Sequence, residues 1–140
     1  MFALDTDTLT LLLRGHDSTA TTARRKANDG EFVITVINWA EVIGGRFESL
    51  IKSADGPEWL KAYERLVRTQ EALVKYPVLP VSSAAATLFD RFLADKKVKK
   101  PKRKDLLIAC IALAHDATLV TRNLKDFQPI PGLKLENWAD

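Results

Sequence analysis

Four acidic residues far apart in the sequence could together hold a cation: Asp5, Glu41, Asp105 and Asp126. Two carboxylates about 4 Å apart repel by about 1 kcal/mol in bulk water and by about 4 kcal/mol at an effective dielectric constant of 20. A pocket that gathered several of them would raise some of their pKa values or recruit a cation. No His or Cys accompanies these positions, and oxygen ligands favour Mg²⁺ or Mn²⁺. Such an ion keeps several waters, one of which can attack a phosphodiester.

Two of these acids also have simpler interpretations. Asp105 begins an apolar helix, where Asp is a favoured N-cap and suits the positive end of the helix dipole. Glu41 could lie on the solvent face of its own helix, although a Glu within an apolar stretch is rarely buried without a partner. The metal-site hypothesis therefore depends on whether the fold brings the acids together.

The stretch around Asp105 indicates how the fold would do so. Residues Leu106–Ala114 are apolar or small on every side, which predicts a helix buried within the domain. The β-branched run Thr118–Thr121 predicts a buried strand directly after it, and a buried helix that leads into a buried strand is typical of a parallel α/β unit. Asp126 follows this strand, and ligands of open parallel sheets bind beyond the carboxyl ends of the strands.

The remaining strands are predicted at Phe2–Leu4, Phe32–Ile34, Val78–Val81 and Lys134–Trp138, with the third confined to a sheet edge by its prolines. We expect one α/β domain over residues 1–140, with a short parallel sheet of four or five strands flanked by helices on both faces. Right-handed crossovers would place Asp5 and Asp126 at the same edge of this sheet. Two short helices are predicted early in the chain: residues 9–13, capped by Thr6 or Asp7, and one capped by Asp17 or Ser18. Two longer helices follow, Val36–Phe47, capped by Thr35, and Gly56–Tyr76. A further helix is capped by Ser82 or Ser83, and its inner face is Ala85, Leu88, Phe89, Phe92 and Leu93. The pair Gly44-Gly45 suggests a break in its helix or a close backbone approach.

Composition limits the class of protein. The 140 residues, 46% hydrophobic and 28% charged, are ordinary for one soluble globular domain. No apolar run approaches the roughly 18 to 20 residues of a membrane span, and Asp5 comes too early for a secretory signal. Cys110 is the single cysteine, within the apolar helix, and we expect an inert packed thiol and a cytoplasmic protein.

A run of Lys and Arg precedes Asp105: seven of the nine residues from Lys96 to Lys104 are basic. Such a run is commonly a solvated loop. It could also be a rim that attracts phosphate beside an acidic site, because clustered cations are typical of nucleic-acid binders. No aromatic residues are interleaved for base stacking, so the run would support binding without sequence specificity.

The sequence as a whole resembles a PIN domain, and more narrowly the VapC-type ribonuclease toxins of prokaryotic toxin–antitoxin pairs. The similarity covers essentially the whole chain. It is carried by the ordered motifs Phe2-Ala3-Leu4-Asp5-Thr6, Ile34-Thr35-Val36-Ile37 leading to Glu41-Val42-Ile43-Gly44, Lys104-Asp105-Leu106-Leu107-Ile108-Ala109, Leu119-Val120-Thr121-Arg122-Asn123, Asp126-Phe127 and Ile130-Pro131-Gly132-Leu133.

The resemblance implies an acidic site of Asp5, Glu41, Asp105 and Asp126 that holds one or two Mg²⁺ or Mn²⁺ ions. Asp5 and Asp105 would be direct ligands, and Glu41 and Asp126 would bind directly or through water. A metal-activated water would cleave single-stranded or looped RNA, leaving 3′-hydroxyl and 5′-phosphate ends. Auxiliary residues would be Asp7, Thr121 and Asn123. RNA-binding residues would be Lys100, Lys102, Arg103, Lys104 and Arg122.

The resemblance also implies partners. The protein would be a homodimer, silenced by a cognate antitoxin that threads into the acidic groove and commonly presents an Arg. The helices between Gly44 and Tyr76 would hold that antitoxin. Two positions depart from the family pattern: Asp7 stands where many relatives have Asn, and Asn123 stands where some carry the fourth acid, so either Asn123 or Asp126 fills that role.

Two rival functions fit parts of the sequence. Asp5-Thr6-Asp7-Thr8-Leu9 matches the signature of haloacid-dehalogenase-like phosphatases, with Asp5 as nucleophile and Asp7 as general acid. That family needs a later Gly-Asp pair, which Thr121-Arg122-Asn123 does not supply, and it gives Glu41 and Asp105 no role. The other rival is a non-catalytic module that binds nucleic acid through the basic run.

Overall fold

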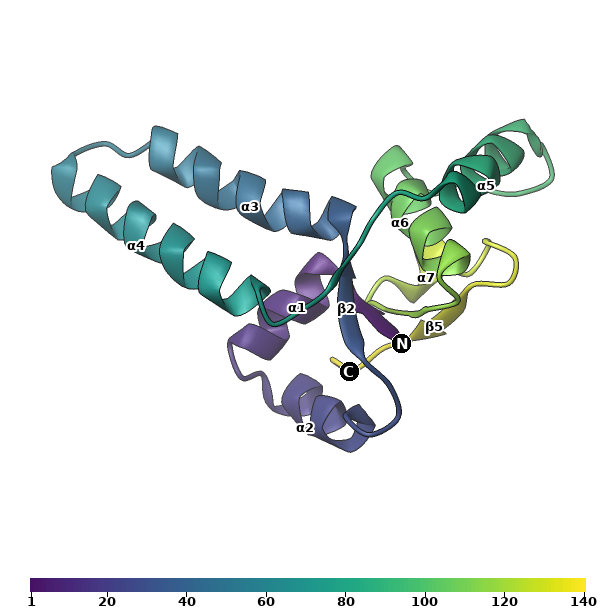
Figure 1. Ribbon diagram of the computed structural model, residues 1–140, viewed down its shortest axis with the longest axis horizontal. Coiled ribbons are helices and arrows are strands. Elements are labelled where there is room, and N and C mark those ends of the chain that lie inside the picture. Colours follow the sequence, from purple (N-terminus) through teal and green to yellow (C-terminus); the bar gives the residue numbers. More distant parts are fainter.

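The computed structural model describes residues 1–140 and contains one parallel sheet of five strands in the order β3-β2-β1-β4-β5 (Figure 1). Strand β1 is central, and its Phe2 lies opposite Phe32 of β2 on one side and Thr118 of β4 on the other. The strand at Val78 forms an edge, as its flanking prolines predict. The strands are β1 (Phe2–Leu4), β2 (Phe32–Thr35), β3 (Val78–Leu79), β4 (Thr118–Val120) and β5 (Lys134–Glu136).

Seven helices connect and cover these strands, and most begin where the sequence predicts. Thr35 caps α3 and Ser82 caps α5, as expected. The cap of α1 is Asp5 rather than Thr6 or Asp7, because the helix begins directly after the strand, and α2 is capped by His16 rather than Asp17 or Ser18. The helices are α1 (Thr6–Leu13), α2 (Asp17–Lys26), α3 (Val36–Ile51), α4 (Gly56–Leu73), α5 (Ser83–Ala94), α6 (Arg103–Ala114) and α7 (Leu124–Phe127).

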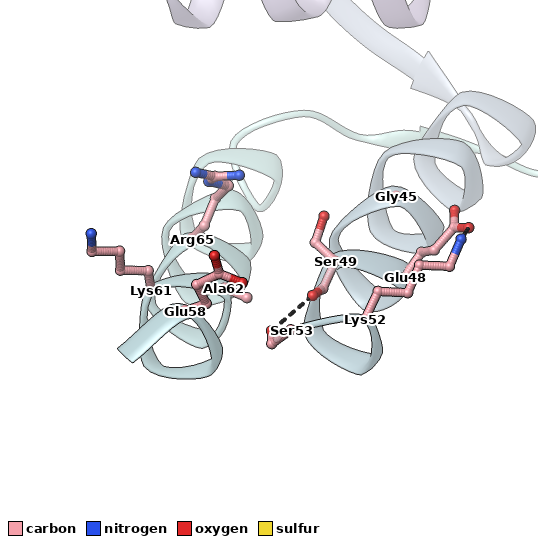
Figure 2. A pocket seen from close by; sticks show the side chains of 9 residues that line it. All are labelled: Gly45, Glu48, Ser49, Lys52, Ser53, Glu58, Lys61, Ala62 and Arg65. Carbon is pink, nitrogen blue, oxygen red and sulfur yellow. Dashed lines mark hydrogen bonds and ion pairs between the residues drawn. The ribbon is translucent and has the colours of Figure 1, made fainter. Parts of the chain in front are cut away.

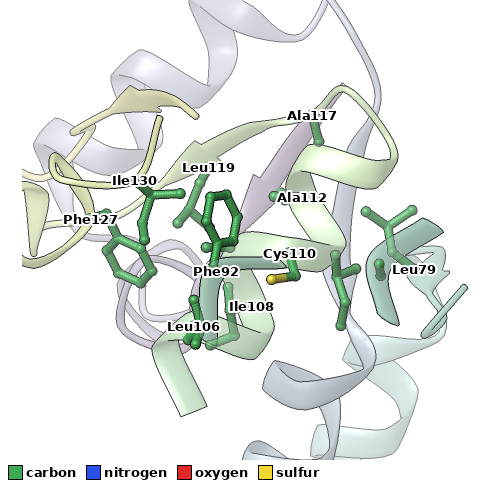
Figure 3. Close-up of a cluster of buried hydrophobic side chains, with 14 of the residues drawn as sticks. Leu79, Phe92, Leu106, Ile108, Cys110, Ala112, Ala117, Leu119, Phe127 and Ile130 are labelled. Atoms are coloured by element: carbon green, nitrogen blue, oxygen red, sulfur yellow. The ribbon is translucent and has the colours of Figure 1, made fainter. Parts of the chain in front are cut away.

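Both faces of the sheet are covered by helices, which confirms the predicted layers. Successive side chains of a strand point to opposite faces, so Ala3 and Leu119 pack toward α5 and α6, whereas Leu4 and Val120 pack toward α1 and α2. Figure 3 shows the first of these cores, in which Phe92 of α5 and Ile108 of α6 lie beside Leu119.

The helix α6 is buried as its uniform apolar character predicts. Its side chains from Leu106 to Ala112, with the exception of Leu107, are at most 4% exposed. Cys110 is packed among them, and burial raises the pKa of its thiol to about 11. Neither α6 nor any other helix combines the length and apolar character that crossing a membrane requires.

Helices α3 and α4 pack against each other as a hairpin that extends away from the sheet (Figure 1). The suggested break or close approach at Gly44-Gly45 is wrong, because α3 is continuous through both glycines and an added Cβ at either would meet no atom within 4 Å. We call the end of this hairpin, residues 47–63, the hairpin tip. Five of its large apolar side chains are 55–65% exposed: Phe47, Ile51, Trp59, Leu60 and Tyr63.

A pair of leucines tests which parts of this architecture hold the domain together. Leu119→Ala should lower the free energy of unfolding by about 2 to 5 kcal/mol, because it removes a fully buried side chain between β4 and α6. Leu60→Ala at the hairpin tip removes a side chain that is 58% exposed, and should change the free energy of unfolding by less than about 0.5 kcal/mol. Urea unfolding of both variants would check this, and equal losses would contradict the assignment of the core.

Candidate active site

Acidic side chains from three separate elements line one cleft of about 350 Å³ at the carboxyl edge of the sheet. The chain winds from β1 to one side through β2 and β3 and then crosses to β4 on the other side, so the sheet order reverses between β1 and β4. This reversal is where open α/β sheets bind ligands. The cleft is lined by Asp5, Thr6, Asp7, Asn38, Glu41, Lys102, Lys104, Asp105, Ile108, Asn123 and Phe127.

Asp5 is fixed by both backbone and side-chain contacts. Its amide donates to the carbonyl of Val120 (3.0 Å), and its Oδ1 accepts from the amide of Thr8 (2.8 Å). Burial raises the pKa of the Asp5 carboxyl, and hydrogen bonds from Thr121 and Thr8 oppose that rise. The predicted auxiliary residue Thr121 is thus fully buried beside Asp5. The negative charge of Asp7, whose side chain is exposed, raises the pKa of Asp5 further.

Glu41 points into the cleft at the end of a relay of hydrogen bonds, so the alternative of a free solvent-facing Glu is wrong. The hydroxyl of Thr35 donates to Oδ1 of Asn38 (2.7 Å), and Nδ2 of Asn38 donates to Oγ1 of Thr6 (3.0 Å). The Thr6 hydroxyl in turn donates to Oε1 of Glu41, while the Lys104 ammonium donates to Oε2. Burial opposes ionisation, but these two donors hold the pKa of Glu41 below its usual value.

Asn38 and Thr6 line the cleft and position Glu41, a role that the sequence alone did not indicate. Asn38 is 2% exposed and has every polar atom paired, which is unusual for an Asn inside a helix. Its spacing of three residues before Glu41 places both on one helix face, and that spacing was the signal available in the sequence.

Asp105 does not cap α6, so the N-cap interpretation is wrong, although the residue does lie at the positive end of the helix dipole. The N-cap position is Lys102, which makes no side-chain capping bond, and Asp105 lies inside the first turn. Burial raises the pKa of the Asp105 carboxyl, and the charges of Asp126 and Glu41 raise it further, whereas Lys104 and Lys102 lower it. The carboxyl of Asp105 therefore lies close enough to Glu41 and Asp126 for their charges to raise its pKa.

Asp126 lies in α7, a short helix that the sequence did not predict, and its side chain is exposed. It is outside the residues that line the cleft, but Nδ2 of Asn123, which does line it, donates to its Oδ2 (2.7 Å). Asn123 thus holds Asp126 beside the cleft, and which of the two fills the role of a fourth acid stays a prediction.

The donor set of the cleft suits a hard divalent cation, because every candidate ligand offers oxygen. As the side chains lie, His, Cys, Asp and Glu form no group of three or more arranged to hold an ion. Two of the acids have other partners: Glu41 is bonded to Lys104 and Asp126 to Asn123. Binding would therefore require these side chains to rearrange.

The predicted RNA-binding cations differ in their placement. Lys102 and Lys104 line the cleft, and the ammonium of Lys102 has no hydrogen-bond or ion-pair partner. The ammonium of Lys100 donates to the carbonyl of Asp95 (2.8 Å). The guanidinium of Arg103 lies 5.2 Å from the ring centre of Phe89, and that of Arg122 lies 3.3 Å from a carboxylate oxygen of Asp140.

Comparisons with known proteins identify the class to which this fold and cleft belong. The PIN domain family matches residues 2–132. Ribonuclease VapC1 of Haemophilus influenzae is 30% identical over 150 residues, which cover 99% of this chain and 98% of that protein. Ribonuclease VapC2 of Rickettsia felis is 65% identical over 34 residues, a local match to 25% of that protein.

A solved structure agrees with these matches. The crystal structure of VapBC2 from Rickettsia felis bound to a DNA fragment from their promoter superposes with a TM-score of 0.75 at 27% identity, covering 98% of each chain. The chain belongs to the PIN-domain family, among the VapC ribonucleases. This membership decides against the phosphatase alternative built on Asp5 and Asp7.

Asp105→Asn should make the metal-free protein more stable at neutral pH. Because the pKa of Asp105 is raised in the folded state, ionising it disfavours folding. This cost is absent below the unfolded-state pKa and is complete once the pH exceeds the folded-state value. The stability difference between the variant and the wild type should therefore grow as pH rises through this window.

Thermal unfolding in EDTA across that pH range would measure the difference. Asp90→Asn, which removes an exposed acid of α5 outside the acidic cleft, is the matched control. A difference that shrinks as pH rises would contradict the placement of Asp105 in a buried acidic cluster.

Proposed function

We propose that this chain is a metal-dependent endoribonuclease, the toxin of a toxin–antitoxin pair, and that the acidic cleft is its active site. The observation that carries the proposal is the convergence of Asp5, Glu41 and Asp105 on one cleft at the reversal of the sheet. The relatives that match the chain over nearly their full length are named ribonucleases. The proposal includes a cytoplasmic location, where RNA substrates are found.

Asp5 and Asp105 are the proposed direct ligands of Mg²⁺ or Mn²⁺. Both are partly buried and have raised pKa values in the absence of a cation, which is the electrostatic situation that a divalent ion relieves. Glu41 and Asp126 would complete the site directly or through water, positioned by Thr6 and Asn123. A bound ion would supply a nucleophilic water and polarise the phosphodiester.

Cations at the entrance would bring RNA to these acids. Lys102 is the best placed, because it lines the cleft and its ammonium is unpaired. The other residues of the basic run extend the positive rim along the loop between α5 and α6, and they contact phosphates without reading sequence. This arrangement fits a single-stranded or looped RNA substrate, whose backbone can follow the rim into the cleft.

Asp105→Asn and Asp5→Asn should each reduce RNA cleavage by at least about a hundredfold, because loss of a metal ligand should cost at least as much as loss of a group that merely orients one. Asparagine keeps the shape of each side chain, so the domain should remain folded. Cleavage of single-stranded RNA in Mn²⁺, together with growth of cells that express the protein alone, measures the effect.

Asp90→Asn is the control for this experiment and should cleave as the wild type does. Full ribonuclease activity of Asp105→Asn would overturn the assignment of the active site. RNA binding without any metal-dependent cleavage in the wild type would instead support the non-catalytic module.

The hairpin tip is the proposed docking surface of the antitoxin. Large apolar side chains clustered on a monomer surface typically mark a protein-binding site, and Leu50, Trp59, Leu60 and Tyr63 line an apolar groove of about 280 Å³ there. Figure 2 shows a second, polar groove of about 540 Å³ between α3 and α4, where Lys61 and Arg65 project from α4. We propose that an apolar segment of the antitoxin covers the first groove.

The relative of known structure supports this partner class, because it is a VapBC assembly. A homodimer is also part of the proposal, and the mass of the purified protein in solution would test it.

Trp59→Ala should weaken the complex with the cognate antitoxin by at least about tenfold, because exposed Trp residues are frequent energetic centres of interfaces. RNA cleavage without antitoxin should be unchanged, since Trp59 lies at the far end of the hairpin from the acidic cleft. The control is Val74→Ala, which removes a side chain that is 85% exposed beyond α4, outside the hairpin tip. Titration calorimetry with the antitoxin measures both, and equal effects would contradict docking at the hairpin tip.

A further inference from the structure

The acidic cleft already contains a cation of its own. The ammonium of Lys104 bonds to Oε2 of Glu41, joining the start of α6 to the second turn of α3 across 63 residues of sequence. We propose that Lys104 is a built-in counter-ion that a divalent metal must displace, so that Lys104 sets the affinity of the site for metal. This inference depends on the proposed metal-dependent function.

Both oxygens of Glu41 are in use. Oε1 accepts from the Thr6 hydroxyl, which Asn38 holds in place, and Oε2 accepts from Lys104. Each oxygen of Glu41 keeps a second lone pair, but the positive charge of the Lys104 ammonium repels a divalent cation that binds the same carboxylate, whereas the Thr6 hydroxyl is neutral. Thr6 is the fixed donor, because it is tied into the buried relay, so Lys104 is the donor that leaves.

The side chain of Lys104 is suited to leave. It is 56% exposed, whereas that of Glu41 is 31% exposed, so the ammonium can swing into solvent on its flexible stem while Glu41 stays. An ion pair of this exposure contributes little net free energy, and a divalent cation offers twice the charge to the same carboxylate. The exchange therefore favours the metal ion, but the affinity of the site for metal is lower than it would be without the Lys104 ammonium.

The pair also accords with the state of the cleft, in which no three acidic side chains are arranged to hold an ion and Glu41 is bonded to Lys104. Lys104 adjoins Asp105, so its charge also offsets the repulsion among the acids when no metal is bound. Lys104 thus stabilises the empty cleft and competes with the ion that fills it.

Calorimetric titration with Mn²⁺ alone tests the proposal without reference to RNA cleavage. Lys104→Gln should bind Mn²⁺ about three- to fivefold more tightly than the wild type, because the competing ammonium is gone. Lys104→Arg keeps a cation at this position and should stay close to the wild type. Lys102→Gln removes a cation that lines the same cleft without bonding to Glu41, and should change the affinity by less than about twofold.

Thermal unfolding gives a second measurement. In EDTA, Lys104→Gln should unfold at a lower temperature than the wild type, and saturating Mn²⁺ should raise its unfolding temperature more than it raises that of the wild type. Circular dichroism shows whether the variant keeps its fold.

Equal Mn²⁺ affinities of Lys104→Gln and Lys102→Gln, or weaker binding by Lys104→Gln than by the wild type, would overturn the competition. If Asp105→Asn nevertheless abolished RNA cleavage, the proposed function would stand without it. Absence of Mn²⁺ uptake by the wild type and by all three Lys variants would overturn both the inference and the proposed metal dependence.

Discussion

Repulsion among carboxylates at one edge of a parallel sheet is the constraint on which the rest of this structure depends. Asp5 and Asp105 are held where burial raises their pKa values, and Glu41 is turned toward them. Each is fixed by rigid elements: a central strand, a buried helix and a relay of paired polar side chains. The stability of the two apolar cores supports a cleft that is itself unfavourable when empty, as is common for functional sites.

Residues with a strong local pattern could be predicted from the sequence. The uniform apolar character of residues 106–114 identified the buried helix α6, and the order of short apolar strands identified the parallel sheet and the edge at which Asp5 lies. The elements that escaped prediction have weak patterns. Helix α7 has four residues, too few to show a helical period in the sequence. Asp126 therefore lies on a helix where the sequence indicated only the segment after a strand.

Contacts between residues far apart in the chain could not be predicted from the sequence. Asn38 alone is an ordinary polar residue in a helix, and only the meeting of α1 with α3 gives its amide a partner in Thr6. Lys104 belongs to a basic run whose members look alike in sequence, and its pairing with Glu41 follows from how α6 lies against α3. Asp105 looked like a helix cap because the helix begins three residues earlier than its apolar pattern.

The architecture separates two tasks in space. The sheet and its covering helices hold the acidic cleft, while the α3–α4 hairpin extends from it and presents apolar side chains (Figure 1). The two regions are joined by α3 itself, which carries Glu41 near one end and Phe47 and Ile51 toward the other. A partner that binds the hairpin tip therefore contacts the same helix that supplies an acid to the cleft.

The central strand β1 is synthesised long before one of the two strands that it pairs with. Phe2–Leu4 leave the exit tunnel long before Thr118–Val120, their second neighbour in the sheet. Pairings so distant in sequence form slowly and late. The acidic cleft at the edge of this sheet is therefore completed only after residues 118–120 have been synthesised, so a nascent chain lacks the cleft until then.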